Sequence, residues 1–544
     1  MISAEMLLLI SFATPVALLL ACGWRVVRER MPTLFAFAPL PALATALWAV
    51  NRPPWVFNEA RLHITIVLDA PGAILLGVAA LLWSAAGLYA STYLRGHPNL
   101  GRFSIYWLLT LTGSLGVFIA ADLFTFYLTF ALLSLAAYGL VVFDGTPKAR
   151  RAGIIYLVLA LLGEIFLLMG FVLLASAIPG DSLAIRDAVA ALPTSPWRDP
   201  TVALLIAGFG LKMGLVPLHV WLPIAHPAAP MPASAVLSGA IIKAGVIGLI
   251  RFLPFDVPLP DWGVALTAIG FLTAFYSVII GITQPNPKTV LAYSSVSQMG
   301  VVATVLGMGL AAGQSSAVMA AAFYAAHHLL AKGALFLAVG VVAATGPRRL
   351  WWALTPAAIL AFGMGGLPLT GGALAKLAVK PVPGDGGVEL LATLSAMGTT
   401  LLMAHFLHRL TANTASDPSA AAPIGLALPW IMMFAAAVAI PWMLYSATGI
   451  GAWSDALQPK MLWAALWPIL IGVGLAFALW RWGRYLPQAP EGDIVVVGQP
   501  AMRVVIRGEE ALERVEGVLR QWPVAGLSLL MLILILGGVM FGGH

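Results

Sequence analysis

Four lysines lie inside long apolar stretches of this sequence, where an ionised side chain is least expected. They are Lys212, Lys243, Lys332 and Lys376. An ionised side chain in the hydrocarbon core of a bilayer costs a few kcal/mol or more, so such charges usually line a water-filled path. Their recurrence along one apolar chain predicts that protons or other ions pass through the folded protein.

The composition places the chain among all-α polytopic membrane proteins. Of its 544 residues, 61% are hydrophobic and only 9% are charged, whereas about 25% of residues are charged in soluble proteins. Apolar runs of about 20 residues, each able to cross the roughly 30 Å hydrocarbon core, recur along the sequence. We predict about 16 membrane-spanning helices, near residues 5–23, 31–50, 71–92, 104–121, 123–143, 153–178, 201–217, 232–253, 262–283, 288–309, 313–343, 351–379, 388–408, 423–447, 460–480 and 523–541.

The positive charges follow the loops that these helices predict. The net charge is +7, but the basic residues cluster beside helix ends, which indicates membrane orientation and not a nucleic-acid partner. We expect a multi-pass protein of the bacterial inner membrane with both termini on the periplasmic side. The loops expected on the cytoplasmic side hold Arg25, Arg28, Arg30, Arg95, Arg102, Lys148, Arg150, Arg151, Lys288, Arg348, Arg349, Arg409, Arg481 and Arg484.

Two of the predicted helices contain glycine and proline next to a lysine. One break is expected at Pro217, five residues after Lys212, and the other at Pro368, eight residues before Lys376. Interrupted helices at matching places indicate two inverted repeats with an ion site near the midplane. We therefore expect half-channels at 104–253 and 262–408, with N-terminal helices at 1–103. The alternative is that glycine and proline serve only helix packing.

The C-terminal part, 423–544, differs from the two repeats. Residues 493–497 are apolar enough for a short extended piece, and residues 501–521 mix charges with apolar residues at helical spacing. The second segment predicts an amphipathic helix that lies on the membrane or on a partner. A solvated connector before the last span is the alternative.

The buried charges are spaced like a proton relay. A desolvated lysine gives up its proton more readily than a hydrated one, and waters between such groups would complete the path. Glu164 is the one acid deep in its predicted span and is the expected partner of Lys212, at a separation of about 4–6 Å. The alternative is a buried ion pair that only ties two helices together.

Two neighbouring histidines extend this relay. His327 and His328 precede Lys332, and His328 shares a helix face with Lys332 because the two are four residues apart. A histidine that titrates near neutral pH suits proton transfer. We expect no metal site, because adjacent histidines point in different directions on a helix. His219 and His226 are interpreted as membrane-interface or structural residues.

Several of these stretches together resemble the proton-antiporter-like membrane subunits. That family includes the large antiporter-like subunits of respiratory complex I (NADH-quinone oxidoreductase), of Mrp-type Na+/H+ antiporters, and of membrane-bound hydrogenase and formate hydrogenlyase complexes. The resemblance implies that Lys212 is central to the first half-channel, that Lys243, His328 and Lys332 connect the halves, and that Lys376 lies at the exit. It covers roughly residues 70–410 and rests on the runs 212–230, 234–245, 292–300 and 328–337.

Two positions depart from the family pattern. Ala131 stands where the family usually has the glutamate that pairs with the central lysine, and Ile224 replaces the usual acid after Leu222-Pro223. Either Glu164 takes over the pairing with Lys212, or the first half-channel is impaired.

The sequence thus predicts an ion-translocating subunit of a multisubunit membrane complex. It would move protons, or exchange protons for Na+, and any redox reaction would belong to partner chains. A single cysteine excludes disulfides and cysteine-bound clusters within this chain, and we expect no cofactor. One alternative is the membrane subunit of an inorganic-carbon uptake system, and another is a structural subunit that has lost transport.

Overall fold

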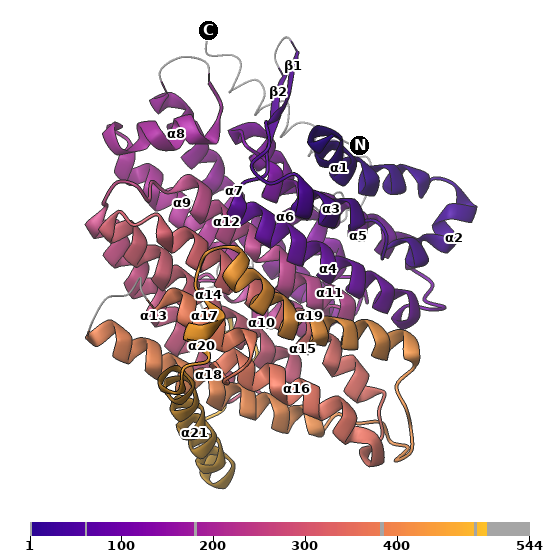
Figure 1. Cartoon of the computed structure of the whole chain (residues 1–544). Coiled ribbons are helices and arrows are strands. Elements are labelled where there is room, and N and C mark those ends of the chain that lie inside the picture. Colours follow the sequence, from indigo (N-terminus) through magenta and orange to yellow (C-terminus); the bar gives the residue numbers. More distant parts are fainter. Residues whose placement is uncertain (1–2, 60–61, 179–181, 381–385, 484–486, 498–544) are drawn as a thin grey trace.

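The described chain is a bundle of helices that carries one small β-hairpin. The computed structural model describes residues 3–59, 62–178, 182–380, 386–483 and 487–497. Figure 1 shows most helices packed side by side, with α21 at one edge of the bundle. The N-terminal elements are α1 (Ala4–Ala21), α2 (Arg25–Leu34), α3 (Leu40–Trp48), β1 (Trp55–Glu59), β2 (Leu62–Ile66) and α4 (Ala70–Tyr93).

The next elements correspond to the two predicted half-channels. The first region holds α5 (Leu100–Ile119), α6 (Leu123–Val141), α7 (Pro147–Ala177), α8 (Ile185–Ala191), η1 (Leu192–Thr194), α9 (Arg198–Met213), α10 (Trp221–Ala228), α11 (Met231–Val236), η2 (Leu237–Ile241) and α12 (Lys243–Phe252). The second holds α13 (Pro260–Gly281), α14 (Pro287–Ala312), α15 (Ser316–Ala343), η3 (Pro347–Arg349), α16 (Leu350–Gly365), α17 (Gly371–Val379) and α18 (Gly387–Thr411). The chain continues through α19 (Ile424–Ala447), α20 (Trp453–Ala456), α21 (Pro459–Trp482) and α22 (Asp493–Val497).

Twelve helices in the described ranges are long and apolar enough to cross a membrane. The polytopic helical fold is therefore confirmed, whereas the number of 16 spans is not. One continuous helix over 31–50 is wrong, because the chain turns between α2 and α3 beside Pro39 and Pro41, and proline disrupts a helix interior. The predicted span 523–541 and the amphipathic helix 501–521 lie outside the described residues. Residues 493–497 form a short helix, so the predicted extended piece is also wrong.

Both glycine- and proline-containing spans are interrupted in the structure. The α9 helix ends at Met213, and Gly214 follows with a φ of 82°. The α16 helix ends at Gly365, and Gly366 follows with a φ of 99°. Glycine adopts this left-handed conformation without a steric penalty and commonly ends helices. Pro217 and Pro368 lie in the segments that separate α9 from α10 and α16 from α17.

The hairpin is a feature that the hydropathy pattern does not predict. Strands β1 and β2 pair antiparallel, with Trp55 opposite Ile66. The Asp122 carboxylate accepts a hydrogen bond of 2.7 Å from the backbone N–H of Thr65 and so ties β2 to the start of α6. Arg251 forms an ion pair of 2.8 Å with Asp69 close by. These contacts connect the hairpin region to the transmembrane bundle.

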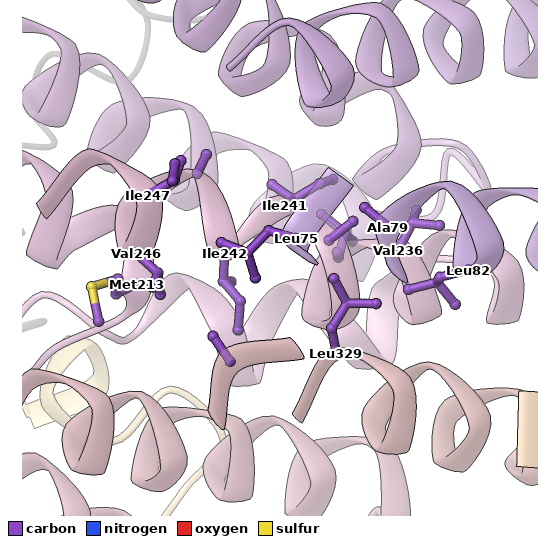
Figure 2. Packing of buried hydrophobic residues seen from close by; sticks show 14 of the residues in the cluster. Leu75, Ala79, Leu82, Met213, Val236, Ile241, Ile242, Val246, Ile247 and Leu329 are labelled. Atoms are coloured by element: carbon purple, nitrogen blue, oxygen red, sulfur yellow. The ribbon is translucent and has the colours of Figure 1, made fainter. Parts of the chain in front are cut away.

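The core brings distant helices together around η2 and α12. Figure 2 shows side chains of α4, α9, α11, α12 and α15 meeting there, among them Leu82, Met213 and Leu329. A Cβ atom added at Gly239, inside η2, would lie 2.1 Å from the Leu82 side chain. Interiors are packed too tightly for such an addition. This packing holds the irregular turn that precedes Lys243.

Helices α13 and α14 meet through glycines, which yields a test of the fold. A Cβ at Gly300 would lie 2.5 Å from the Gly270 carbonyl oxygen, whereas Gly474 on α21 has nothing within 4 Å. We expect Gly300→Ala to destabilise the protein by about 1–3 kcal/mol, because the backbones must move apart. Gly474→Ala is the matched control and should leave thermal unfolding in detergent unchanged. Equal melting temperatures for the two variants would contradict this packing.

Candidate functional site

The predicted relay residues lie in the interior of the bundle. Six of them, Glu164, Lys212, Lys243, His327, His328 and Lys332, are buried. The seventh, Lys376, is half-buried and lines a cavity. The structure therefore keeps all seven away from the lipid-facing surface of the chain, and it arranges them in three groups.

The first group surrounds the Lys212 ammonium. Lys212 lies in the last turn of α9, and its Nζ donates a hydrogen bond of 2.9 Å to the Ser134 hydroxyl on α6. The same ammonium lies 5.5 Å from the centroid of the Phe130 ring and 5.8 Å from that of Tyr156. Aromatic faces attract cations, most strongly where water is excluded. Ser134 thus supplies the polar partner on the helix that carries Ala131.

Glu164 is near this group but is not bonded to it. Lys212 and Glu164 interact electrostatically, yet no ion pair of 4.0 Å or less joins them. Neither carboxylate oxygen of Glu164 has a hydrogen-bond partner within the described residues. A directly bonded pair that ties α7 to α9 is therefore not present. The separation of 4–6 Å expected from the sequence stays a prediction.

The second group joins Lys243 to His328. The Lys243 Nζ lies 2.6 Å from Nδ1 of His328 and donates a further hydrogen bond of 3.1 Å to the Ser238 carbonyl. That carbonyl belongs to η2, a π-helical turn directly before α12. Turns of this kind are rare and frequently lie at functional sites. The irregular turn here positions a backbone acceptor for a buried ammonium.

Further hydrogen bonds occupy the space between this pair and Lys332. The Ser238 hydroxyl lies 2.6 Å from the Ser295 hydroxyl, which donates to the Leu291 carbonyl at 3.1 Å. The Lys332 ammonium donates to the same carbonyl at 2.8 Å and also to the Ser294 hydroxyl. Residues of η2, α14 and α15 therefore connect two lysines that lie 89 positions apart in the sequence, from 243 to 332.

The third group lies between His327 and Lys376. His327 points in a different direction from His328, because neighbouring residues on a helix are about 100° apart, and it faces the start of α17. A Cβ atom added at Gly371 would lie 2.8 Å from Nδ1 of His327, so glycine is required for this approach. Neither ring nitrogen of His327 has a hydrogen-bond partner within the described ranges. His327 is thus the predicted relay residue that points toward the second helix break.

Lys376 borders a cavity between α14, α15, α17 and α18. Its Nζ reaches back across the break to donate a hydrogen bond to the Gly365 carbonyl at the end of α16. The cavity has a volume of about 260 Å³ and is also lined by Gln298, Tyr324 and Thr399. Tyr324 donates to Gln298 at 2.6 Å, and Gln298 donates to Thr399 at 3.0 Å. Such a space has room and polar partners for several water molecules.

Sequence reasoning missed most of the neutral partners of these charges. The serines lie within the run 292–300 on α14 and on α6, but nothing in their spacing indicates which one meets a lysine. The surroundings of His226 were not apparent from the sequence either. This residue is fully buried, its ring lies 4.5 Å from that of Phe336, and it interacts electrostatically with Lys288 and Lys332. Lys288 lies at the start of α14, as predicted for a helix end, but it is buried and donates to the Ala229 carbonyl.

The described residues contain no cluster that would hold a metal ion. No three histidine, cysteine, aspartate or glutamate side chains converge in the ranges that the structure covers. Lysine, histidine, serine and carbonyl groups form the site instead. Such groups can pass protons along hydrogen bonds and bound water.

Comparisons with known proteins identify the family. A family model described as the transmembrane region of NADH:quinone oxidoreductase and Mrp antiporter subunits matches residues 120–401. The chain belongs to this family. The matched range contains all the predicted relay residues, and it covers α6 to α18, the region of both interrupted spans.

Two curated relatives of this family member illustrate its range. Hydrogenase-4 component B of Escherichia coli is 30% identical over 306 residues, which cover 53% of this chain and 44% of the relative. Subunit N of the NADH-quinone oxidoreductase of Desulforudis audaxviator is 34% identical over 325 residues, covering 57% and 63%. The chain thus spans about half to two thirds of the length of these relatives.

A solved structure confirms the fold. The Mrp complex from Dietzia sp. DQ12-45-1b contains a chain that aligns with a TM-score of 0.76 and 22% identity. The alignment covers 99% of this antiporter-family chain and 63% of the other chain. This chain is therefore a multi-pass membrane protein with the fold of the antiporter-like subunits.

The bond between Ser134 and Lys212 is open to a direct test. Hydrogen bonds to charged groups contribute roughly 1.5–3 kcal/mol, so we expect Ser134→Ala to reduce ion flux by about tenfold or more. Ser104→Ala is the control, because Ser104 is also buried but bonds only to the Leu100 carbonyl of its own helix. Flux would be followed with a pH-sensitive dye in vesicles that hold the assembled complex. Equal flux in the two variants would remove Ser134 from the site.

Proposed function

We propose that this protein translocates protons, or exchanges protons for Na+, as a membrane subunit of a larger complex. The path would run through Glu164, Lys212, Lys243, His327, His328, Lys332 and Lys376. The observation that supports the proposal is the group of buried polar contacts that extends from His328 and Lys243, past Ser238, Ser295 and the Leu291 carbonyl, to Lys332. A purely structural core would fill this space with apolar side chains at a lower cost in free energy.

The geometry of Lys243 and His328 supports transfer of charge between them. In the 2.6 Å contact, a protonated lysine donates to a neutral Nδ1, so one of the two groups carries the proton. A second positive charge arriving at Lys332 would repel the proton held between Lys243 and His328, because Coulomb interactions are strong in a poorly hydrated interior. Successive arrivals would then drive the proton toward His327, Lys376 and the cavity.

The two halves would perform equivalent steps in this scheme. We propose half-channels at 104–253 and 262–408, flanked by 1–103 and 423–544. In each half, a lysine lies close to the end of a helix that stops at a glycine and continues after a proline. Lys212 is in the last turn of α9, and Lys376 bonds to the last residue of α16. Helix C-terminal ends favour positive charge, and broken helices create such ends at midplane ion sites.

The partners are proposed from the relatives. Their names place them in a hydrogenase, a quinone oxidoreductase and an Mrp complex, so we infer that this chain assembles with other membrane subunits in a bacterial inner membrane. Affinity purification followed by mass spectrometry would identify the partners. Hydrogenase, quinone-reductase or Mrp-type chains would support the proposal, whereas a single zinc-containing soluble partner would favour inorganic-carbon uptake.

Lys332 provides the decisive test of transport. It is completely buried, its ammonium donates to the Leu291 carbonyl on α14, and in the proposed path it connects the two halves. We expect Lys332→Ala to abolish proton uptake by the assembled complex. Lys332→Arg should also impair uptake, because arginine stays protonated. Proton uptake would be measured in reconstituted vesicles, with assembly checked on native gels.

An exposed lysine provides the control for this test. Lys460 lies at the start of α21 and is exposed, so Lys460→Ala should leave uptake and assembly unchanged. Lys288 would not serve as a control, because it is buried. If Lys332→Ala assembles and pumps like the unmodified complex, the chain is a structural subunit.

A further inference from the structure

The segment after α21 places an acid inside the antiporter core. Asp493 is only 4% exposed, although it lies near the end of the described chain. Its Oδ2 is 3.0 Å from Nε2 of His219 and accepts a hydrogen bond of 2.7 Å from the Tyr293 hydroxyl. Tyr276 on α13 also interacts with this carboxylate. Residues from three parts of the chain thus meet at one buried carboxylate.

Residues 487–497, here called the strap, are held on the expected cytoplasmic side. Glu491 forms an ion pair of 2.6 Å with Lys148, which belongs to a predicted cytoplasmic loop. The Ala489 carbonyl accepts a hydrogen bond of 3.1 Å from Gln284 in the loop between α13 and α14. Gly492 packs against Ile224, with 3.0 Å between an added Cβ and the isoleucine side chain. The strap therefore contacts the rest of the chain through the residues that directly precede Asp493.

The carboxylate of Asp493 is kept ionised. Burial alone raises the pKa of a carboxyl group, but the hydrogen bonds from His219 and Tyr293 outweigh it and hold the pKa of Asp493 below its ordinary value. A tether has no need of such a charge, because apolar contacts would hold the strap without desolvating an ion. The buried negative charge instead suits a neighbour that gains a positive one.

His219 has the properties of that neighbour. It is completely buried, and its Nδ1 has no hydrogen-bond partner within the described residues. A carboxylate on one ring nitrogen holds the N–H there, orients the ring and leaves the other nitrogen free to accept a proton. His219 lies in the connecting segment between α9 and α10, seven residues after Lys212. It is thus well placed to exchange protons between the cytoplasmic side and the first half-channel.

We propose that His219 is a proton-relay residue of the first half-channel and that Asp493, carried in by the strap, is its positioning residue. His219 takes a proton at Nδ1, becomes an imidazolium while its Nε2–H stays on Asp493, and releases the proton from Nδ1 to the next acceptor. The C-terminal part of the chain is then required to complete the transport site. This inference rests on the proposed function, because it assumes that protons pass through the first half.

The test compares two neighbouring acids of the strap. Asp493→Asn keeps a hydrogen-bonding side chain but removes the charge that stabilises the imidazolium. We expect uptake at neutral pH to fall about tenfold or more, and the pH midpoint of uptake to move lower by about one to three units. Asp493→Glu should recover part of both effects. Glu491→Gln removes the exposed ion pair with Lys148 but leaves the bonds of Asp493 in place, so it should change neither.

The measurement uses the complete complex in vesicles with the cytoplasmic side outward. Uptake is recorded against external pH for each variant, with Lys332→Ala in parallel. An unchanged midpoint in Asp493→Asn overturns the inference even if the rate falls, because a mere tether would lower only the amount of active complex. If Asp493→Asn fails to assemble, His219→Gln and Asp493→Glu give the same comparison, and a midpoint unchanged in both overturns the inference. Loss of uptake in Lys332→Ala with normal Asp493→Asn rejects this inference alone, whereas normal uptake in Lys332→Ala rejects the proposed function.

Discussion

The buried ammonium groups are the constraint on which the rest of this structure depends. Each of the four lysines must replace its lost water, and each does so with neutral partners. Lys212 uses a serine hydroxyl, Lys243 a histidine and a carbonyl, Lys332 a carbonyl and a hydroxyl, and Lys376 a carbonyl. A bonded carboxylate would stabilise the charged state strongly and hold the proton. Neutral partners favour the charge less, which agrees with the proposal that each lysine loses and regains its proton.

Irregular backbone supplies several of these partners. A regular helix uses its carbonyls internally, so a membrane protein exposes free acceptors only where a helix ends or is distorted. Gly365 offers its carbonyl at the end of α16, and Ser238 offers its carbonyl within the π-helical turn η2. The positive φ of Gly214 and Gly366 is what stops α9 and α16 at the required depth. The breaks are therefore part of the chemistry of the site, and the packing around η2 keeps one of them in place.

Local signals made much of this arrangement predictable from the sequence. A lysine in an apolar run, or a Gly-Pro break, is visible within a few residues, and so most of the spans and both interruptions could be expected. His328 was expected to share a helix face with Lys332, but its bonded partner in the structure is Lys243. Partners that meet across the bundle carry no such signal. Ser134 and Lys212 lie 78 positions apart, and Asp493 and His219 lie 274 apart. Hydropathy likewise could not separate α2 from α3 or reveal the hairpin, because turns and strand pairing depend on tertiary contacts.

The absence of the usual acid at position 131 has a physical explanation in this pattern. Ser134 lies three residues further along α6, on the neighbouring turn, and its hydroxyl bonds to Lys212. Lys212 thus has a neutral bonded partner, like the other three lysines, which also lack a bonded carboxylate within the described residues. Glu164 adds a negative charge that Lys212 feels without a direct bond. Because the Ser134 hydroxyl supplies a polar partner from the same helix, Ala131 is not by itself evidence against the proposed transport.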